Sequence, residues 1–303
     1  MVTGRFAPSP SGRMHLGNVF SALLAWLSVR SQGGRMLLRI EDLDPDRCRP
    51  AYAEQLKRDL DWLGLDWDAE QPPQSTRSEA YGAQFRRLEE RGLVYPCYCS
   101  REALHGASAP HAADGRVIYG GTCRHLTDAE RAEQTKKPAW RLLVPHEEYA
   151  VRDGLQGLYR ENLSLDCGDF ILRRADGVYA YQLAVVCDDA AGGVTQVVRG
   201  RDLLTSTPRQ MYLQELLGFD HPQYYHVPLL TDETGRRLSK RDGDLDLGAL
   251  RERMTAPELL GRLAWAARLL PENAPTTAAE LVPLFDWSRV PAADIVIRAY
   301  FSV

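Results

Sequence analysis

The chain has 303 residues, a net charge of −4 at neutral pH and 44% hydrophobic residues, a composition typical of a soluble globular protein. No basic segment followed by an apolar one opens the chain, and no apolar run is long enough to span a bilayer. We therefore expect a cytoplasmic protein with no membrane attachment. The acidic net charge gives no overall attraction for nucleic acid, so an RNA partner would need local basic patches such as Arg236, Arg237, Lys240 and Arg241.

The first part of the chain predicts a strand, a helix and a second strand. Residues 2–7 form a short apolar run that ends in a Pro- and Gly-containing turn. Between 18 and 31 the apolar residues recur at helical spacing, and Gly33-Gly34 ends this segment before a strand at 36–40. Such units build a parallel sheet with flanking helices, so we expect an α/β fold.

The remaining elements continue this pattern after an interruption. Helical spacing recurs at 52–63 and at 81–88, whereas residues 95–126 have little periodicity and contain three cysteines. A helix at 179–186, a strand at 194–198, a helix at 208–217 and a strand at 226–230 follow. Thr255 and Glu258 have capping-box spacing ahead of a helix, and the stretch from about Asp286 gives no prediction.

Two short motifs have the residue types of a nucleotide site. Residues 5–18 lead from the first strand into His15-Leu16-Gly17-Asn18, where backbone N–H groups at a helix start can bind an anion and a glycine admits a nucleotide. For these four residues alone, an incidental histidine in a capped turn is the better explanation; the preceding residues favour the nucleotide site. The second motif, Leu238-Ser239-Lys240, lies in a basic loop that could neutralise a departing pyrophosphate, although a solvated basic loop is the commoner explanation of such a run.

Together the motifs resemble class I aminoacyl-tRNA synthetases, and more closely the glutamyl-tRNA synthetase group. The chain departs from the family signatures in having Asn18 where the first has a histidine, and in keeping only the Leu-Ser-Lys core of the second. The stretches that match the family in order are 5–18, 38–44, 179–184, 198–202 and 237–240. The resemblance implies a Rossmann-like catalytic domain formed by residues 1–94 and by the later part of 127–240. It also implies a small zinc-bearing insertion at 95–126 that continues into the start of 127–240, and a C-terminal helical region at 241–303.

The resemblance also implies a glutamate site and an ATP site. Glu41 would bind the α-ammonium of glutamate, and two arginines with a tyrosine would surround its side chain. A guanidinium pairs with a carboxylate through two hydrogen bonds, so Arg199 argues for glutamate over glutamine. Without the resemblance, a surface acidic cluster would explain Glu41, and a structural salt bridge would explain Arg199. The implied glutamate-binding residues are Arg5, Ala7, Ser9, Glu41, Tyr181 and Arg199; the ATP-binding residues are His15, Gly17, Asn18, Leu238, Ser239 and Lys240, of which His15 and Lys240 are catalytic.

Three of the six cysteines, Cys97, Cys99 and Cys123, crowd into one segment instead of spreading as a disulfide framework would. Three thiolates and one further ligand suit a structural Zn²⁺. Ordinary coordination chemistry favours His125 as the fourth ligand, whereas the resemblance implies Tyr119, which we expect. The alternative is that these cysteines are simply buried.

Only 303 − 240 = 63 residues follow Lys240, which is too few for the anticodon-binding domain of full-length glutamyl-tRNA synthetases. In this the chain resembles glutamyl-queuosine tRNA(Asp) synthetases. That family implies activation of L-glutamate by ATP and Mg²⁺ to glutamyl-adenylate without tRNA, then transfer to queuosine at the wobble position of tRNA(Asp). Three alternatives stay open: a minimal glutamyl-tRNA synthetase that charges the 3′ end, a non-catalytic zinc-containing RNA-binding paralogue, and a nucleotidyltransferase of another pathway. We expect a monomer.

Overall fold

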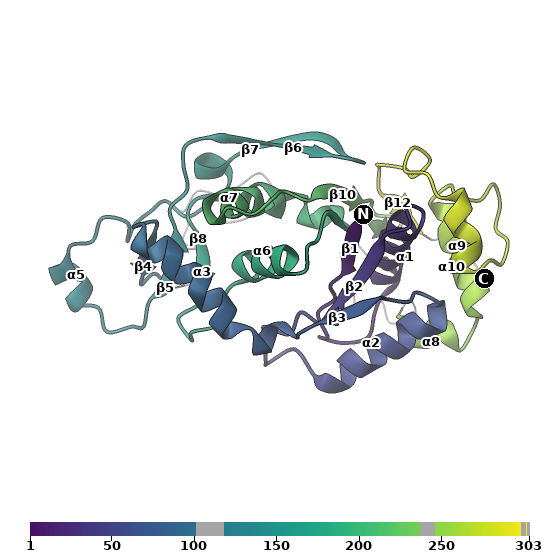
Figure 1. Cartoon of the computed structure of the whole chain (residues 1–303), viewed down its shortest axis with the longest axis horizontal. Coiled ribbons are helices and arrows are strands. Elements are labelled where there is room, and N and C mark those ends of the chain that lie inside the picture. The colour runs from purple at the N-terminus through teal and green to yellow at the C-terminus, as the bar shows by residue number, and fades with distance from the viewer. Residues whose placement is uncertain (101–117, 237–245, 298–300, 302–303) are drawn as a thin grey trace.

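The computed structural model describes residues 1–100, 118–236, 246–297 and 301 (Figure 1). The predicted nucleotide-loop residues Leu238, Ser239 and Lys240 lie outside these ranges. Among the described residues, no helix is long and apolar enough to cross a membrane.

The N-terminal part forms the predicted strand–helix–strand unit. β1 (Thr3–Phe6) is connected through α1 (Leu16–Arg30) to β2 (Arg35–Arg39), and the two strands pair in parallel. The chain then continues through α2 (Pro50–Leu63) to β3 (Ala69–Gln71), which pairs in parallel with β2. Almost the whole of α1 is buried, because it packs on this sheet on one side and on the C-terminal helices on the other.

A second parallel pair continues the layer beyond β1. β9 (Gln196–Gly200) pairs with β10 (Gln223–Val227) in parallel, and α7 (Thr207–Leu217) connects them after the 3₁₀ segment Arg201–Ser206. β9 follows α6 (Tyr181–Ala191) and lies beside β1, where Thr195 N–H donates to Thr3 O at 2.9 Å. Five parallel strands therefore point their carboxyl ends to the same edge, which is where ligands bind in open α/β sheets.

The chain between these two halves forms an antiparallel region, which lies beside the parallel sheet at the left in Figure 1. After α3 (Ser78–Glu90), β4 (Val94–Cys97), β5 (Ala139–Leu142) and β8 (Phe170–Arg173) form one antiparallel sheet, with the short helix α5 (Asp128–Ala132) beyond it. β6 (Glu148–Asp153) and β7 (Gly157–Asn162) form a hairpin that reaches back over α7 towards β10. At its turn Gly154 N–H donates to Tyr224 O at 2.8 Å, so the hairpin joins the antiparallel region to the parallel sheet.

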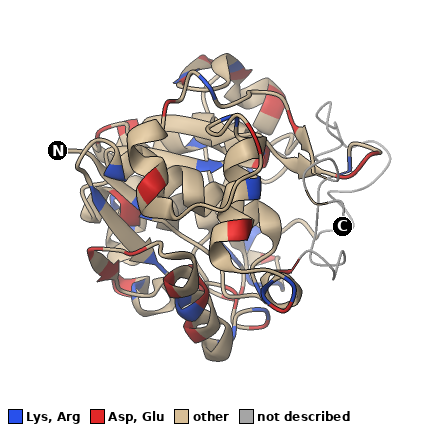
Figure 2. Ribbon diagram, turned by 90° about the vertical axis from the view of Figure 1, so that its right-hand side faces the viewer, with Lys and Arg blue, Asp and Glu red and all other residues tan. Residues whose placement is uncertain are grey.

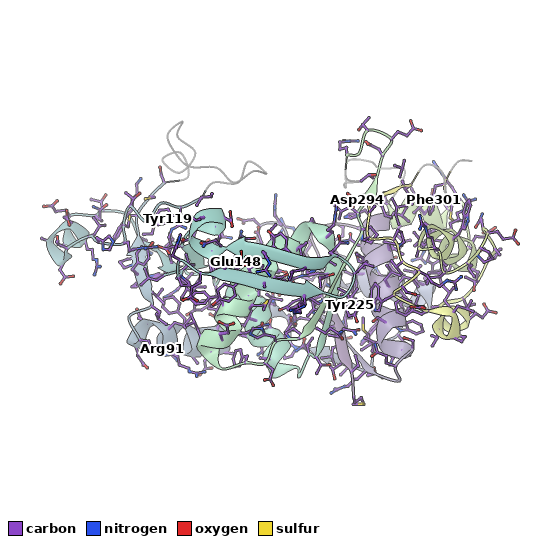
Figure 3. All side chains as sticks on the ribbon, turned by 90° about the horizontal axis from the view of Figure 1, so that it is seen from above. Arg91, Tyr119, Glu148, Tyr225, Asp294 and Phe301 are labelled. Atoms are coloured by element: carbon purple, nitrogen blue, oxygen red, sulfur yellow. The ribbon has the colours of Figure 1, made fainter. Side chains whose placement is uncertain are left out.

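The C-terminal part is helical and packs against the first half of the sheet. Its elements are α8 (Leu247–Arg251), α9 (Ala256–Ala266) and α10 (Ala278–Leu281), and β12 (Ile295–Val296) returns to pair with β11 (Leu230–Thr231). The capping box predicted at Thr255 and Glu258 is confirmed. Figure 3 shows Phe301 and Tyr119 towards opposite ends of the long axis, so the C-terminal region and the cysteine segment lie far apart.

Two predicted strands are displaced by a few residues. The strand expected at 194–198 begins at Gln196, because Val194 N–H still donates to Asp189 O in the turn that closes α6. The strand expected at 226–230 ends at Val227, because Pro228 has no N–H to continue the ladder.

Candidate active site

A cavity of about 400 Å³ opens at the carboxyl ends of β1, β9 and β10 and at the start of α1. Every predicted site residue that the structure describes, apart from the cysteine segment, lines it: Arg5, Ala7, Ser9, His15, Gly17, Asn18, Glu41, Tyr181 and Arg199. These residues come from four separate stretches of the chain, and the parallel arrangement of the strands brings them to one edge of the sheet.

One end of the cavity is built around Arg199, at the carboxyl end of β9. Its side chain is 5% exposed; Nη2 donates to Thr207 Oγ1 at 2.9 Å, and Nη1 donates to Tyr181 Oη at 3.4 Å. Nε donates to His226 Nε2 at 3.0 Å. The guanidinium is thus held in one orientation next to a phenol, an arrangement that suits recognition of a carboxylate.

Arg5 and Glu41, which line this end of the cavity, belong to a buried network of acidic and basic groups. The fully buried Arg39 donates through Nη2 to Glu41 Oε1 at 3.1 Å and through Nη1 to Asp189 Oδ1 at 2.6 Å. Nε of Arg5 lies 3.4 Å from the same Asp189 oxygen. Burial raises the pKa of Glu41, and the positive charges of Arg39 and Arg5 oppose that rise. Burial also acts to raise the pKa of Asp189, but Arg39 and Arg5 outweigh it and hold the pKa below its usual value.

The other end of the cavity is the N-terminus of α1. His15 is the N-cap residue: its Nδ1 accepts from Gly17 N–H at 3.1 Å, and its own N–H donates to Asn18 Oδ1 at 3.2 Å. Because Nδ1 is used as an acceptor, the proton of the neutral imidazole lies on Nε2, which is a donor suited to a phosphate oxygen. A Cβ at Gly17 would lie 3.0 Å from His15 Cε1, so a larger residue would press against this ring.

Asp246 and Leu247, which follow Lys240 in the chain, lie beside the start of α1. Asp246 forms a backbone bridge with His15, and Leu247 N–H donates to Met14 O at 2.9 Å. Residue 246 is therefore held beside the helix start at which ATP was predicted to bind.

Four residues that supply charge to this site or orient its side chains were not singled out from the sequence: Arg39, Asp153, Asp189 and His226. Asp189 lies within the apolar helix α6, where a buried acidic residue is itself a signal of a paired charge. His226 and Asp153 lie behind Arg199 with side chains that are 0% exposed, and they come from parts of the chain that carry no motif.

The predicted metal ligands converge at the edge of the antiparallel sheet. The Sγ atoms of Cys97, Cys99 and Cys123 all lie within 4.8 Å of one another. Tyr119 Oη lies 3.4 Å from Cys97 Sγ and 3.9 Å from Cys99 Sγ, whereas the exposed His125 is not in the group of clustered ligand atoms. Three soft thiols and a phenol at one point form a donor set that fits Zn²⁺.

A basic residue lies directly against this donor set. The guanidinium carbon of Arg141 is 3.7 Å from the centre of the Tyr119 ring, and Arg141 Nη1 donates to Asp169 O at 2.6 Å. A cation over the ring offsets the negative charge that a phenolate with three thiolates would add.

A cavity at the carboxyl ends of parallel strands, beside a helix N-terminus, is where nucleotide-binding α/β proteins hold their ligand. Residues 1–265 match the family described as tRNA synthetases class I (E and Q), catalytic domain. The chain therefore belongs to this family, and the predicted assignment as a synthetase-type ligase is confirmed.

Individual relatives cover nearly the whole chain. A glutamyl-Q tRNA(Asp) synthetase of Nitratidesulfovibrio vulgaris is 48% identical over 313 residues, which cover 99% of this chain and 96% of that protein. Another, of Geobacter sulfurreducens, is 47% identical over 92% of this chain and 87% of its own length. The crystal structure of a glutamate tRNA ligase from Elizabethkingia meningosepticum in complex with its amino acid superimposes with a TM-score of 0.84 at 27% identity, covering 98% of this chain and 67% of that chain. The resemblance read from the motifs is confirmed at the level of the family.

Proposed function

We propose that this chain activates L-glutamate with ATP and Mg²⁺ to glutamyl-adenylate without tRNA, and then transfers the glutamate to queuosine at the wobble position of tRNA(Asp). The observation that carries the proposal is the convergence of the predicted glutamate and ATP residues on one cavity. The printed names of relatives at 48% identity over 99% of the chain support the choice of acceptor.

The charges around the cavity match those of glutamate. Arg199 and Tyr181 would bind the side-chain carboxylate, with Arg5 adding a second guanidinium close by. Glu41 would bind the α-ammonium, which leaves the α-carboxylate free to attack the α-phosphate of ATP. A neutral amide in place of the carboxylate would leave the guanidinium charge poorly compensated, so the pocket favours glutamate over glutamine.

The helix end of the cavity would hold the phosphates. The Nε2 proton of His15 is a donor for a phosphate oxygen, the positive end of the α1 dipole favours an anion there, and Gly17 leaves room for the nucleotide to approach. Lys240 would stabilise the charge of the departing pyrophosphate; this role stays a prediction supported by the anchoring of residue 246 beside His15.

Zinc at Cys97, Cys99, Cys123 and Tyr119 is part of the proposal. The ion would fix the end of β4 to the loop that carries Tyr119 and Cys123, a part of the chain with a small core of its own. None of these four residues lines the active-site cavity, so the ion would have a structural role and would take no part in the reaction. A reducing cytoplasm, where ATP and tRNA are available, would keep the thiols free to bind metal.

RNA must reach this site although the charge of the protein gives no general attraction. Figure 2 shows basic and acidic segments interspersed over the described part of the face in view. Contacts to tRNA would therefore depend on local groups near the cavity, as the net charge of −4 predicted.

The first experiment is ATP–pyrophosphate exchange with purified protein and glutamate, without RNA, followed by transfer of labelled glutamate to tRNA(Asp) with and without queuosine. Exchange without RNA and labelling of queuosine-containing tRNA(Asp) alone would support both steps. Label at the 3′ end of tRNA(Glu) would instead indicate a minimal glutamyl-tRNA synthetase. No exchange under any condition would favour a non-catalytic RNA-binding protein, and size-exclusion chromatography of the same sample tests the expected monomer.

A further inference from the structure

Arg199 is held from behind by two buried side chains that do not line the cavity. Its Nε donates to His226 Nε2 at 3.0 Å, and His226 Nδ1 lies 2.6 Å from Asp153 Oδ2. His226 is on β10, and Asp153 is the last residue of β6 in the hairpin that reaches over from the antiparallel region. The chain Asp153–His226–Arg199 thus connects the antiparallel region to the substrate cavity.

The chemistry of these three groups fixes the position of the imidazole proton. A guanidinium offers N–H donors and no acceptor, so Nε2 of His226 must accept and the proton must lie on Nδ1. From there it is donated to the carboxylate of Asp153. Burial, together with the positive charges of Arg199 and Arg5, lowers the pKa of His226 to about 4 against the raising effect of Asp153. The ring is therefore neutral near pH 7 and serves as an acceptor.

The orientation of the guanidinium follows from this acceptor. With Nε bound to His226 and Nη2 bound to Thr207 at 2.9 Å, the plane of the guanidinium is fixed at two points. Nη1 then lies towards Tyr181 Oη, at 3.4 Å, on the cavity side. Without the acceptor, Nε would be a buried donor with no partner, and the side chain would turn to satisfy it.

We propose that Asp153 and His226 are positioning residues that aim the Nη atoms of Arg199 at the side-chain carboxylate of glutamate, and that they thereby determine the preference for glutamate over glutamine. The inference rests on the proposed function, because it needs Arg199 to bind that carboxylate.

Asp153→Asn is a sharp test because its amide can be accommodated in only one orientation. Oδ1 of Asp153 accepts three backbone N–H groups, from Leu155 at 2.9 Å, Gln156 at 2.8 Å and His226 at 3.2 Å. The amide oxygen must keep this place, so the NH₂ group faces His226 Nδ1. His226 must then accept at Nδ1 and carry its proton on Nε2, where it opposes the N–H of Arg199. The shape is kept while the tautomer is reversed, as in a catalytic triad whose aspartate is replaced by asparagine.

A matched pair of substitutions at His226 tests the acceptor directly. The amide of His226→Asn can occupy the place of Nδ1 and bind Asp153, but it leaves Arg199 Nε without an acceptor. The longer side chain of His226→Gln can bring its amide oxygen to the place of Nε2 and accept from Arg199. We expect His226→Asn to weaken glutamate binding and His226→Gln, which keeps an acceptor for Arg199 Nε, to bind glutamate nearly as well as the wild type.

The measurement is glutamate-dependent ATP–pyrophosphate exchange, with KM determined separately for glutamate and ATP and with glutamine as the competing substrate. We expect Asp153→Asn and His226→Asn to raise the KM for glutamate ~10-fold or more and to narrow the preference over glutamine, with the KM for ATP changed less than ~2-fold. Asp176→Asn, an exposed acid paired with Arg174, is the matched control and should change neither. Circular dichroism melts establish that each variant is folded, and ¹⁵N spectra of the histidine should show the proton on Nδ1 in the wild type and on Nε2 in Asp153→Asn.

The outcomes separate the inference from the function. If the wild type shows no exchange, the proposed function is wrong and the inference falls with it. If the wild type is active and folded Asp153→Asn and His226→Asn keep its KM for glutamate, the inference alone is overturned. Should Asp153→Asn fail to fold, an equal KM for glutamate in His226→Asn and His226→Gln would overturn it by itself.

Discussion

Arg39 and Glu41, two residues apart at the carboxyl end of β2, form a buried ion pair in which Arg39 Nη2 donates to Glu41 Oε1 at 3.1 Å. Arg39 also pairs with Asp189, so its guanidinium lies between two carboxylates, of which Glu41 lines the cavity and Asp189 is also paired with Arg5. Because a charge left unpaired in the interior is costly, this arginine is required both for the fold and for the ionised state of Glu41.

Replacing Arg39 by methionine should therefore destabilise the protein by roughly 3 kcal/mol, measured as the free energy of unfolding in urea. Arg160→Met is the control: Arg160 and its partner Glu148 are 54% and 53% exposed, and its loss should cost less than about 1 kcal/mol. An equal loss in the free energy of unfolding for the two variants would show that Arg39 does not stabilise the fold by compensating Glu41 and Asp189.

Arg199→Gln should weaken the use of glutamate much more than that of ATP. Loss of a charge-assisted pair to a carboxylate predicts an increase of about 100-fold in the KM for glutamate, while the KM for ATP stays close to that of the wild type. The neighbouring Arg201, paired with Asp294, does not line the cavity, and Arg201→Gln serves as the control. An unchanged dependence on glutamate in folded Arg199→Gln would rule out the assigned pocket.

Lys240→Ala should slow adenylate formation without loosening glutamate binding. A lysine that stabilises the departing pyrophosphate acts in the transition state, so we expect kcat for exchange to fall by about 100-fold with little change in the KM for glutamate. Lys136→Ala, which removes an exposed lysine outside the cavity, is the matched control. A rate equal to that of the wild type would remove Lys240 from the mechanism.

The zinc proposal predicts that Tyr119, and not His125, is the fourth ligand of the ion. Purified protein should contain one zinc per chain by elemental analysis, and Tyr119→Phe should release it to a chelator at least about 10-fold more readily than the wild type. His125→Ala and Cys187→Ala should retain the metal, because His125 lies outside the cluster and Cys187 is buried in α6. The reverse result, with loss in His125→Ala and retention in Tyr119→Phe, would make the histidine the ligand.

The buried His226 also predicts how stability depends on pH. Its pKa is lowered to about 4 by burial and by Arg199, so between that value and about 6.5 the unfolded chain binds a proton that the folded one does not. Stability from this group is complete above pH 6.5 and is lost as pH falls towards 4, by up to about 3 kcal/mol. Asp153, whose pKa is lowered by its contact with His226 against the effect of burial, acts in the same direction at lower pH.

Thermal melts at pH 7.5 and pH 5 test this dependence. The melting temperature of the wild type should fall more on acidification than that of His226→Gln, which has no imidazole to titrate. Equal shifts in the two proteins would mean that His226 titrates in the folded protein as it does in the unfolded chain.

Much of the active site could be predicted because its residues belong to short motifs. The turn after β1, the helix start with His15 and Gly17, and the acid after β2 are encoded by neighbouring residues whose spacing is visible in the sequence. The helix α1 was predicted in the same way, from apolar residues at helical spacing. The proposed domain boundaries stay predictions, although the first antiparallel strand does begin at Val94.

The strands of the antiparallel region were not predicted from the sequence. In the structure residues 148–153 alternate between exposed and buried, but the apolar Ala150 lies on the exposed side and the charged Asp153 on the buried side, so the sequence has no clear alternation of polar and apolar residues. The last strand, at Ile295–Val296, is too short to leave any periodicity.

The sequence by itself determined the α/β class, the family and the motif residues that line the cavity, since helix and strand periodicity and short motifs depend on residues close together in the chain. Tertiary structure alone decided that Asp153 and His226, 73 residues apart, meet behind Arg199, and that Arg39 is shared between Glu41 and Asp189. Such contacts depend on how distant strands and helices pack, and a buried polar group finds its partner only once that packing has formed.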